Sequence, residues 1–111
     1  MILVDTSIWV DHFRSGNARL QSLLLAEQVA CHPFVLGELA CGNLHRRDEV
    51  LRLLSDLPMC DVVRDSDVLG LLNVRRLFGR GVGWVDVHLL ASALASRFAL
   101  WTSDRRLDRI A

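Results

Sequence analysis

The sequence predicts an α/β fold in which a small parallel β-sheet of about four strands is flanked by helices. Short apolar runs alternate with longer segments of helical spacing along the chain, an order typical of layered α/β domains. The first run, Ile2-Leu3-Val4, is wholly apolar, as expected of a strand whose two faces are both buried. A length of 111 residues with 51% hydrophobic residues fits one globular domain, residues 1–111.

The first half of the chain predicts two strands and four helices. Thr6 or Ser7 can cap the helix that follows the first strand, and Ser15-Gly16-Asn17 ends it. Pro33 suits the first position of a later helix, which Gly42-Asn43 closes. The expected order is a strand at 2–4, a helix that follows Thr6 or Ser7 and ends at Ser15-Gly16-Asn17, a helix through Leu20, Leu23 and Leu24, a strand at 29–31, a helix at 33–41 and a helix at 47–57.

The second half predicts two more strands and three more helices. Pro58 ends the preceding helix, because proline interrupts helical hydrogen bonding. Gly79, Gly81 and Gly83 predict a loose loop that also contains Arg80. The expected order is a strand at 60–63, a helix at 65–78, a helix at 84–97, a strand at 98–102 and a last helix after Asp104.

All 13 basic residues are arginine, and 13 acidic residues bring the net charge to zero. The absence of lysine excludes a P-loop lysine, a Schiff-base lysine and the lysine that phospho-aspartate enzymes keep beside their aspartate. Residues 1–67 contain ten acidic residues and six arginines, whereas residues 68–111 contain three acidic residues and seven arginines. The positive excess therefore lies in the carboxy-terminal part.

No apolar run is long enough to span a bilayer, and Met1 leads into the first strand without a basic leader. We therefore expect a cytoplasmic protein with no membrane contact. Cys31, Cys41 and Cys60 include no Cys-x-x-Cys pair, which argues against a disulfide framework. A zinc site of Cys31, His32 and Cys41 has no apparent fourth ligand, so we expect buried free thiols.

Four acidic residues adjoin apolar segments and are candidates for chemistry. A buried carboxylate is costly unless it is paired or bound to a cation. For any one acid alone, capping a helix or pairing with an arginine is the commoner role, and Glu27 and Asp61 also adjoin apolar residues. The four candidates are Asp5, Glu38, Asp86 and Asp104.

Two of these acids, Asp5 and Asp104, fall at the ends of predicted strands. Because parallel strands end at the same edge of a sheet, both emerge at that edge, where helices can add Glu38 and Asp86. Neighbouring carboxylates repel one another unless a divalent cation lies between them. Oxygen ligands favour Mg²⁺ or Mn²⁺ over zinc, and such a site suits phosphodiester hydrolysis.

Four segments carry a family resemblance, and together they extend over essentially the whole chain. They are Ile2-Leu3-Val4-Asp5-Thr6-Ser7, Gly37-Glu38-Leu39, Gly83-Trp84-Val85-Asp86-Val87-His88-Leu89-Leu90-Ala91 and Leu100-Trp101-Thr102-Ser103-Asp104-Arg105-Arg106-Leu107. In this order they resemble the motifs of PIN-domain ribonucleases, in particular the VapC-type toxins of type II (VapBC) toxin–antitoxin systems.

The resemblance implies a PIN-like fold and a Mg²⁺- or Mn²⁺-dependent endoribonuclease toxin. It also implies a VapB-type antitoxin that neutralises the toxin, an RNA substrate and a homodimer. Relatives usually continue into a short further strand, so the C-terminal end is short relative to the family. The implied catalytic and metal-binding residues are Asp5, Glu38, Asp86 and Asp104, and the implied supporting hydroxyls are those of Thr6 and of Thr102 or Ser103.

Arginines near the glycine-rich loop and after Asp104 are candidates for binding RNA phosphates. They are Arg75, Arg76, Arg80 and Arg105, with Arg106 and Arg109 beside them. The alternative is that they keep a helix face soluble. Asp108 is one helical turn beyond Asp104, and we expect it to form a surface ion pair with Arg106 or Arg109.

Aromatic and histidine side chains near the motifs are expected to pack rather than to catalyse. Trp84 and Trp101 lie inside apolar runs, which favours core packing over base stacking. His88 follows Asp86 by two residues and on a helix points away from it. The same structural role is expected of His12, His32 and His45.

Two other functions are compatible with parts of the sequence. One is a catalytically inactive PIN-like scaffold that binds RNA or a protein partner. The other is a phospho-aspartate phosphatase that uses Asp5, which is disfavoured because residue 7 is serine rather than a second aspartate and because lysine is absent.

Overall fold

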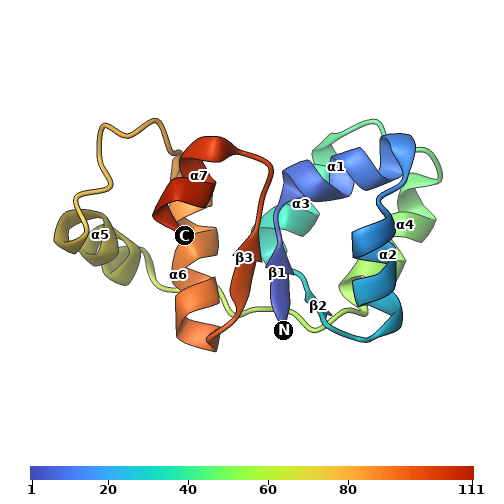
Figure 1. Cartoon of the computed structure of the whole chain (residues 1–111), viewed down its shortest axis with the longest axis horizontal. Helices are drawn as coiled ribbons and strands as arrows, with labels where there is room; N and C mark the ends of the chain where they lie inside the picture. The colour runs from blue at the N-terminus through green and yellow to red at the C-terminus, as the bar shows by residue number, and fades with distance from the viewer.

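The computed structural model describes all 111 residues and contains three strands and seven helices (Figure 1). None of the seven helices could span a lipid bilayer. The elements are β1 (Ile2–Val4), α1 (Thr6–Ser15), α2 (Ala18–Leu25), β2 (Val29–Ala30), α3 (Pro33–Cys41), α4 (Arg47–Ser55), α5 (Asp65–Val74), α6 (Trp84–Ser96), β3 (Ala99–Trp101) and α7 (Arg105–Ile110).

The three strands are parallel and lie in the order β2-β1-β3. Ile2 in the central strand pairs with Val29 on one side and with Ala99 on the other. In Figure 1, α1 to α4 lie on the side of β2, and α5 to α7 lie on the side of β3. The predicted α/β fold with a small parallel sheet is confirmed.

The predicted strand at 60–63 is wrong, and the sheet has three strands rather than about four. The chain makes only one parallel bridge to the sheet here, between Cys31 and Met59, the residue just before this segment. Pairing stops at this bridge because the chain after Cys31 turns into helix α3 at Pro33. No extended segment is left for residues 60–63 to pair with. The carbonyl oxygen of Asp61 instead accepts a hydrogen bond from Ser92 Oγ of α6 at 2.8 Å.

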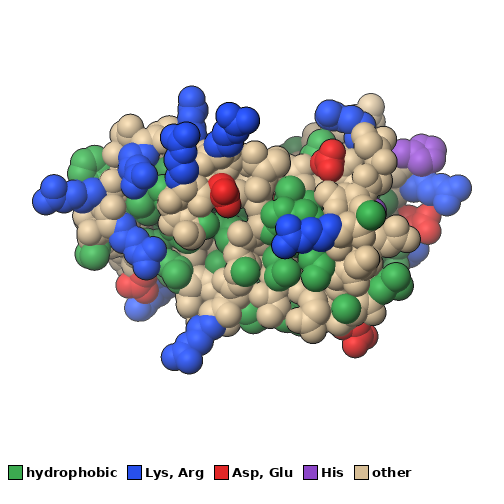
Figure 2. Space-filling view, in the orientation of Figure 1, with side chains coloured by type: hydrophobic (Ala, Val, Ile, Leu, Met, Phe, Trp, Pro, Cys, Tyr) green, Lys and Arg blue, Asp and Glu red, His purple; other side chains and the backbone are tan.

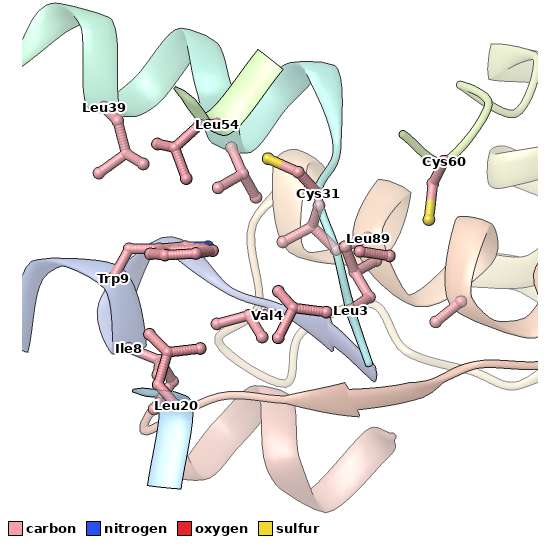
Figure 3. Close-up of a cluster of buried hydrophobic side chains, with 14 residues drawn as sticks. Leu3, Val4, Ile8, Trp9, Leu20, Cys31, Leu39, Leu54, Cys60 and Leu89 are labelled. Atoms are coloured by element: carbon pink, nitrogen blue, oxygen red, sulfur yellow. The ribbon is translucent and has the colours of Figure 1, made fainter. Parts of the chain in front are cut away.

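The main core surrounds the central strand. Leu3 and Val4 of β1 are completely buried, and Trp9 of α1 is 2% exposed. Figure 3 shows the Trp9 ring beside Leu39 and Leu54, which come from α3 and α4. The hydrophobic contacts therefore tie the first four helices to β1. A second cluster of buried residues joins α5, α6 and α7 and consists of Val68, Leu77, Val87, Leu90, Ala91, Leu107 and Ile110.

Helix α1 begins at Thr6, so its capping position is Asp5 rather than Thr6 or Ser7, the residues that the sequence predicts there. Asp5 occupies the position before its first turn, but the Asp5 side chain makes no capping hydrogen bond. Thr6 and Ser7, the predicted caps, lie inside the helix. Their hydroxyls are therefore free to bond with other side chains at the end of β1.

The cysteines are all free, as expected, but only Cys31 and Cys60 are buried. Cys41 is exposed, because it ends α3 on the solvent side, so the prediction of three buried thiols is wrong for this residue. Burial raises the pKa of Cys31 to about 11. Burial likewise raises the pKa of Cys60, so both thiols remain protonated at neutral pH.

Replacing Ser92 tests how the segment after Pro58 is held. The Ser92 hydroxyl bonds to the Asp61 carbonyl and lies 3.0 Å from the ring of buried His32. Ser92→Ala removes this hydroxyl, so both groups lose this hydrogen-bond partner. We expect the free energy of unfolding in urea to fall by about 1–3 kcal/mol. Ser22→Ala, at an exposed serine of α2, is the control and should change it by less than about 0.5 kcal/mol. Equal stability of the two variants would contradict this role of Ser92.

Candidate active site

Two of the four candidate acids come after a strand, and the other two lie on helices. Asp5 connects β1 to α1, and Asp104 directly precedes α7 after β3. Glu38 lies on α3, the helix that follows β2, and Asp86 lies in the first turn of α6. Because β1 and β3 are parallel neighbours, Asp5 and Asp104 emerge at the same edge of the sheet. Figure 1 shows α1 and α7 beginning at this common end.

Asp5 is the most buried of the four and is held by two hydroxyl groups. Its Oδ2 atom accepts hydrogen bonds from Ser7 Oγ and Thr102 Oγ1, both at 2.8 Å. Thr102 Oγ1 in turn accepts the Asp104 N–H at 3.0 Å, and Ser7 Oγ accepts the Ser103 N–H at 3.1 Å. This network fixes the ends of β1 and β3 relative to each other.

The other three acids are also each held through one oxygen. Asp104 Oδ1 accepts the backbone N–H of Arg106 at 2.8 Å, and Asp86 Oδ2 accepts that of Gly83 at 2.9 Å. Glu38 Oε1 accepts the hydroxyl of Thr6 at 2.9 Å. In each of the four acids, Asp5 included, the second carboxylate oxygen has no hydrogen-bond partner in the protein.

The electrostatics of Asp86 link three of the acids. Burial raises the pKa of the Asp86 carboxyl, the Gly83 N–H lowers it, and the nearby charges of Asp5 and Asp104 raise it further. The net shift is upward. The Asp86 carboxylate is therefore close enough to Asp5 and to Asp104 to be repelled by both charges.

The donor atoms of this group fit a hard divalent cation. All are carboxylate oxygens, which Mg²⁺ and Mn²⁺ prefer, and each acid keeps one oxygen free while the other is anchored. The side chains do not form a ready chelate, since no three His, Cys, Asp or Glu residues are grouped so as to hold a metal ion. A cation at this edge would need to draw the free oxygens together.

The predicted supporting residues differ in how they contact the acids. The hydroxyls of Thr6 and Thr102 bond to Glu38 and Asp5 respectively, whereas the Ser103 hydroxyl makes no hydrogen bond and only its backbone N–H takes part. Sequence reasoning missed Ser7, which it treated as a helix cap. The signal that could have found it is a second hydroxyl residue directly after the strand that ends in Asp5.

The arginine candidates are exposed, and none of them forms an ion pair. The predicted pairing of Asp108 with Arg106 or Arg109 is wrong, because the only arginine ion pairs are Arg47–Asp48 and Arg64–Asp67. Figure 2 shows arginine side chains gathered over the half of the molecule that contains α5, α6 and α7, with acidic side chains nearby. The candidates Arg75, Arg76, Arg80 and Arg105 all belong to this half.

The prediction that Trp84 packs in the core is wrong, because it is 40% exposed at the start of α6. Trp101 is half-buried and packs against the main core, with the Arg19 guanidinium 4.7 Å from its ring centre. His88 is fully buried and contacts Asp65 through Nε2 at 3.1 Å, which agrees with the expected packing role. His32 is also buried, and desolvation followed by the charge of His88 lowers its pKa to about 4.

Removing the Thr102 hydroxyl tests the network around Asp5. Thr102→Val keeps the side-chain shape but leaves the Asp104 N–H without its acceptor and Asp5 with one hydroxyl donor. We expect a loss of about 1–3 kcal/mol in the free energy of unfolding, measured in urea. Ser103→Ala is the matched control, since it removes a hydroxyl without partners and should cost less than about 0.5 kcal/mol. If both variants lose the same stability, the hydroxyl network has no special role.

Neutralising Asp86 tests the cost of its charge, which burial raises first and the charges of Asp5 and Asp104 raise further. The pKa of Asp86 is higher in the folded than in the unfolded protein, so the charged carboxylate lowers the free energy of unfolding when the pH is above the folded-state pKa. This loss of stability disappears as the pH falls toward the unfolded-state pKa. Asp86→Asn retains an acceptor for the Gly83 N–H and should raise Tm at pH 7 by a few degrees in the presence of a chelator. The gain should vanish near pH 4, whereas the exposed control Asp56→Asn should show no such pH dependence. A lower Tm for Asp86→Asn at pH 7 would show that the charged Asp86 does not cost stability.

Comparison with known proteins agrees with this architecture. The family model described as PIN domain matches residues 2–111. Two similar proteins are both named Ribonuclease VapC32 and come from Mycobacterium tuberculosis strains CDC 1551 / Oshkosh and ATCC 25618 / H37Rv. Each is 51% identical to this chain over 108 residues, and the match covers 96% of this chain and 87% of the relative. The α/β fold and the match over nearly the whole chain lead to one conclusion: the chain belongs to the PIN-domain family, with the VapC-type toxins as its relatives.

Proposed function

We propose that this protein is a Mg²⁺- or Mn²⁺-dependent endoribonuclease, the toxin of a VapBC-type pair, which hydrolyses phosphodiester bonds of RNA. The observation that carries the proposal is the set of four carboxylates, each anchored by one oxygen with the other left free. Similarity to proteins named as ribonucleases supports the choice of RNA as the substrate.

Asp5, Glu38, Asp86 and Asp104 are the residues that would hold the cation. The chemistry supplied by bound Mg²⁺ or Mn²⁺ is activation of water and neutralisation of charge on the phosphate. The protein's own contribution is positioning. Thr102 and Ser7 orient the carboxylate of Asp5, Thr6 orients Glu38, and backbone N–H groups orient Asp86 and Asp104. Less entropy would therefore be lost when a cation draws the free oxygens together.

The unpaired arginines on the α5, α6 and α7 half would bind the RNA backbone. A guanidinium without a carboxylate partner keeps its fork of N–H donors available for phosphate oxygens. The protein carries no net charge, so RNA binding would depend on these local arginines rather than on long-range attraction. Arg75, Arg76, Arg80 and Arg105 would supply these contacts.

A VapB-type antitoxin would neutralise the protein, which would act in the cytoplasm as a homodimer. Support for an antitoxin comes from an apolar groove of about 330 Å³ between α1, α2 and α4, lined by seven hydrophobic residues out of eight. Phe13 and Leu53 of this groove are 37% and 60% exposed, and an amphipathic helix of a partner fits such a surface.

Cleavage of structured RNAs with unpaired loops tests the nuclease function. The purified protein should cut RNA with Mg²⁺ or Mn²⁺ and should stop when a chelator is added. Asp5→Asn and Asp86→Asn should each reduce the rate by at least about 100-fold, while Asp56→Asn should leave it unchanged. Undiminished cleavage by the first two variants would refute the proposal. RNA binding without metal-stimulated cleavage would favour the inactive scaffold.

A further inference from the structure

Trp84 exposes an aromatic surface beside the candidate acids. It is the first residue of α6, directly after Gly83, whose N–H is bonded to Asp86. The buried ring of His88 meets it edge-on, with ring centres 4.7 Å apart and planes at 89°. His88 is itself held by Phe34 at 4.8 Å and by Asp65. The indole is therefore fixed from one side while 40% of the residue remains exposed.

Arg106 reaches the same loop from α7. A β-carbon placed on Gly81 would lie 2.7 Å from Cδ and 3.0 Å from Nε of Arg106, so the arginine side chain lies directly against the glycine backbone. Gly81 has a φ of +78°, which independently favours glycine. The guanidinium forms no ion pair although Asp104 and Asp108 are two residues away on either side.

Trp84 and Arg106 therefore meet the glycine-rich loop from two helices that also carry acids of the site. Arg106 donates its backbone N–H to Asp104, and Trp84 lies in the same helical turn as Asp86. We propose that Trp84 and Arg106 form a subsite for one unpaired nucleotide of RNA, in which the indole stacks on the base and the guanidinium binds the adjoining phosphate. This proposal deepens the nuclease function and rests on it for the choice of RNA.

The two side chains have complementary chemistry for such a ligand. An aromatic face stacks on a base only when the base is not paired within a duplex. A planar guanidinium binds two phosphate oxygens at once. Together they recognise a base and its backbone without reading a particular base. The subsite would therefore direct cleavage to unpaired nucleotides beside the carboxylates.

The test measures RNA affinity apart from cleavage. The protein (residues 1–111) in EDTA is titrated into a fluorescein-labelled, unstructured RNA of about eight nucleotides, and anisotropy gives Kd. Trp84→Ala and Arg106→Ala should each weaken binding about tenfold, whereas Trp84→Phe and Arg106→Lys should lose less. The slope of log K against log salt should fall by about 0.7 in Arg106→Ala only.

An abasic strand of the same length separates the two contacts. On this strand the effect of Trp84→Ala should disappear, because there is no base to stack, while the effect of Arg106→Ala should remain.

Leu25→Ala and Arg52→Ala are the control variants. Leu25→Ala removes an exposed apolar residue of α2, and Arg52→Ala removes an exposed unpaired arginine of α4. Both should bind like the parent protein. Circular dichroism would confirm that every variant is folded.

Three results would overturn the subsite. The first is unchanged RNA affinity in Trp84→Ala and Arg106→Ala. The second is an equal loss from Trp84→Ala on the normal and abasic strands. The third is a change of oligomeric state in Trp84→Ala with unchanged RNA affinity, which would make the tryptophan a protein contact. If the predicted affinity pattern holds but the parent protein does not cleave RNA with metal, the subsite stands and the nuclease function falls.

Discussion

The hydrogen bonds that Thr102 and Ser7 donate to Asp5 are the interaction on which the site depends. They join the ends of β1 and β3, the two strands that deliver Asp5 and Asp104. The same Thr102 hydroxyl accepts the Asp104 N–H, so one buried oxygen fixes two acids relative to each other. Because these donors occupy a single carboxylate oxygen, the acid is oriented without being neutralised.

This arrangement places like charges together at a cost in stability. The raised pKa of Asp86, caused first by burial and then by Asp5 and Asp104, records that cost. Burying unpaired charge is tolerated where function requires it. A PIN-domain ribonuclease with a bound divalent cation would recover this energy, because the cation supplies the counter-charge that the absent lysines cannot supply. Stability and proposed activity thus depend on the same carboxylates.

The sequence predicted the parts of the fold that local pattern determines. The apolar Ile2-Leu3-Val4 run and the proline at the start of α3 placed β1 and α3 correctly. The sequence-based prediction was wrong where contacts between distant segments determine the structure. Residues 60–63 have the composition of a strand, but no neighbouring strand is available to pair with them. Likewise, Trp84 lies in an apolar run, yet its position at the first turn of α6 leaves it exposed. The four acids were predicted, but their anchored and free oxygens required the three-dimensional contacts.

Anomalous diffraction from crystals grown with Mn²⁺ would show whether the free oxygens of the anchored carboxylates bind a cation. We expect a manganese peak at the common end of β1 and β3, within about 2.5 Å of carboxylate oxygens of Asp5, Asp86 and Asp104. The oxygens that accept the Thr102 and Gly83 hydrogen bonds should keep those partners. A peak elsewhere, or no peak at this edge at millimolar Mn²⁺, would show that these carboxylates do not form the cation site.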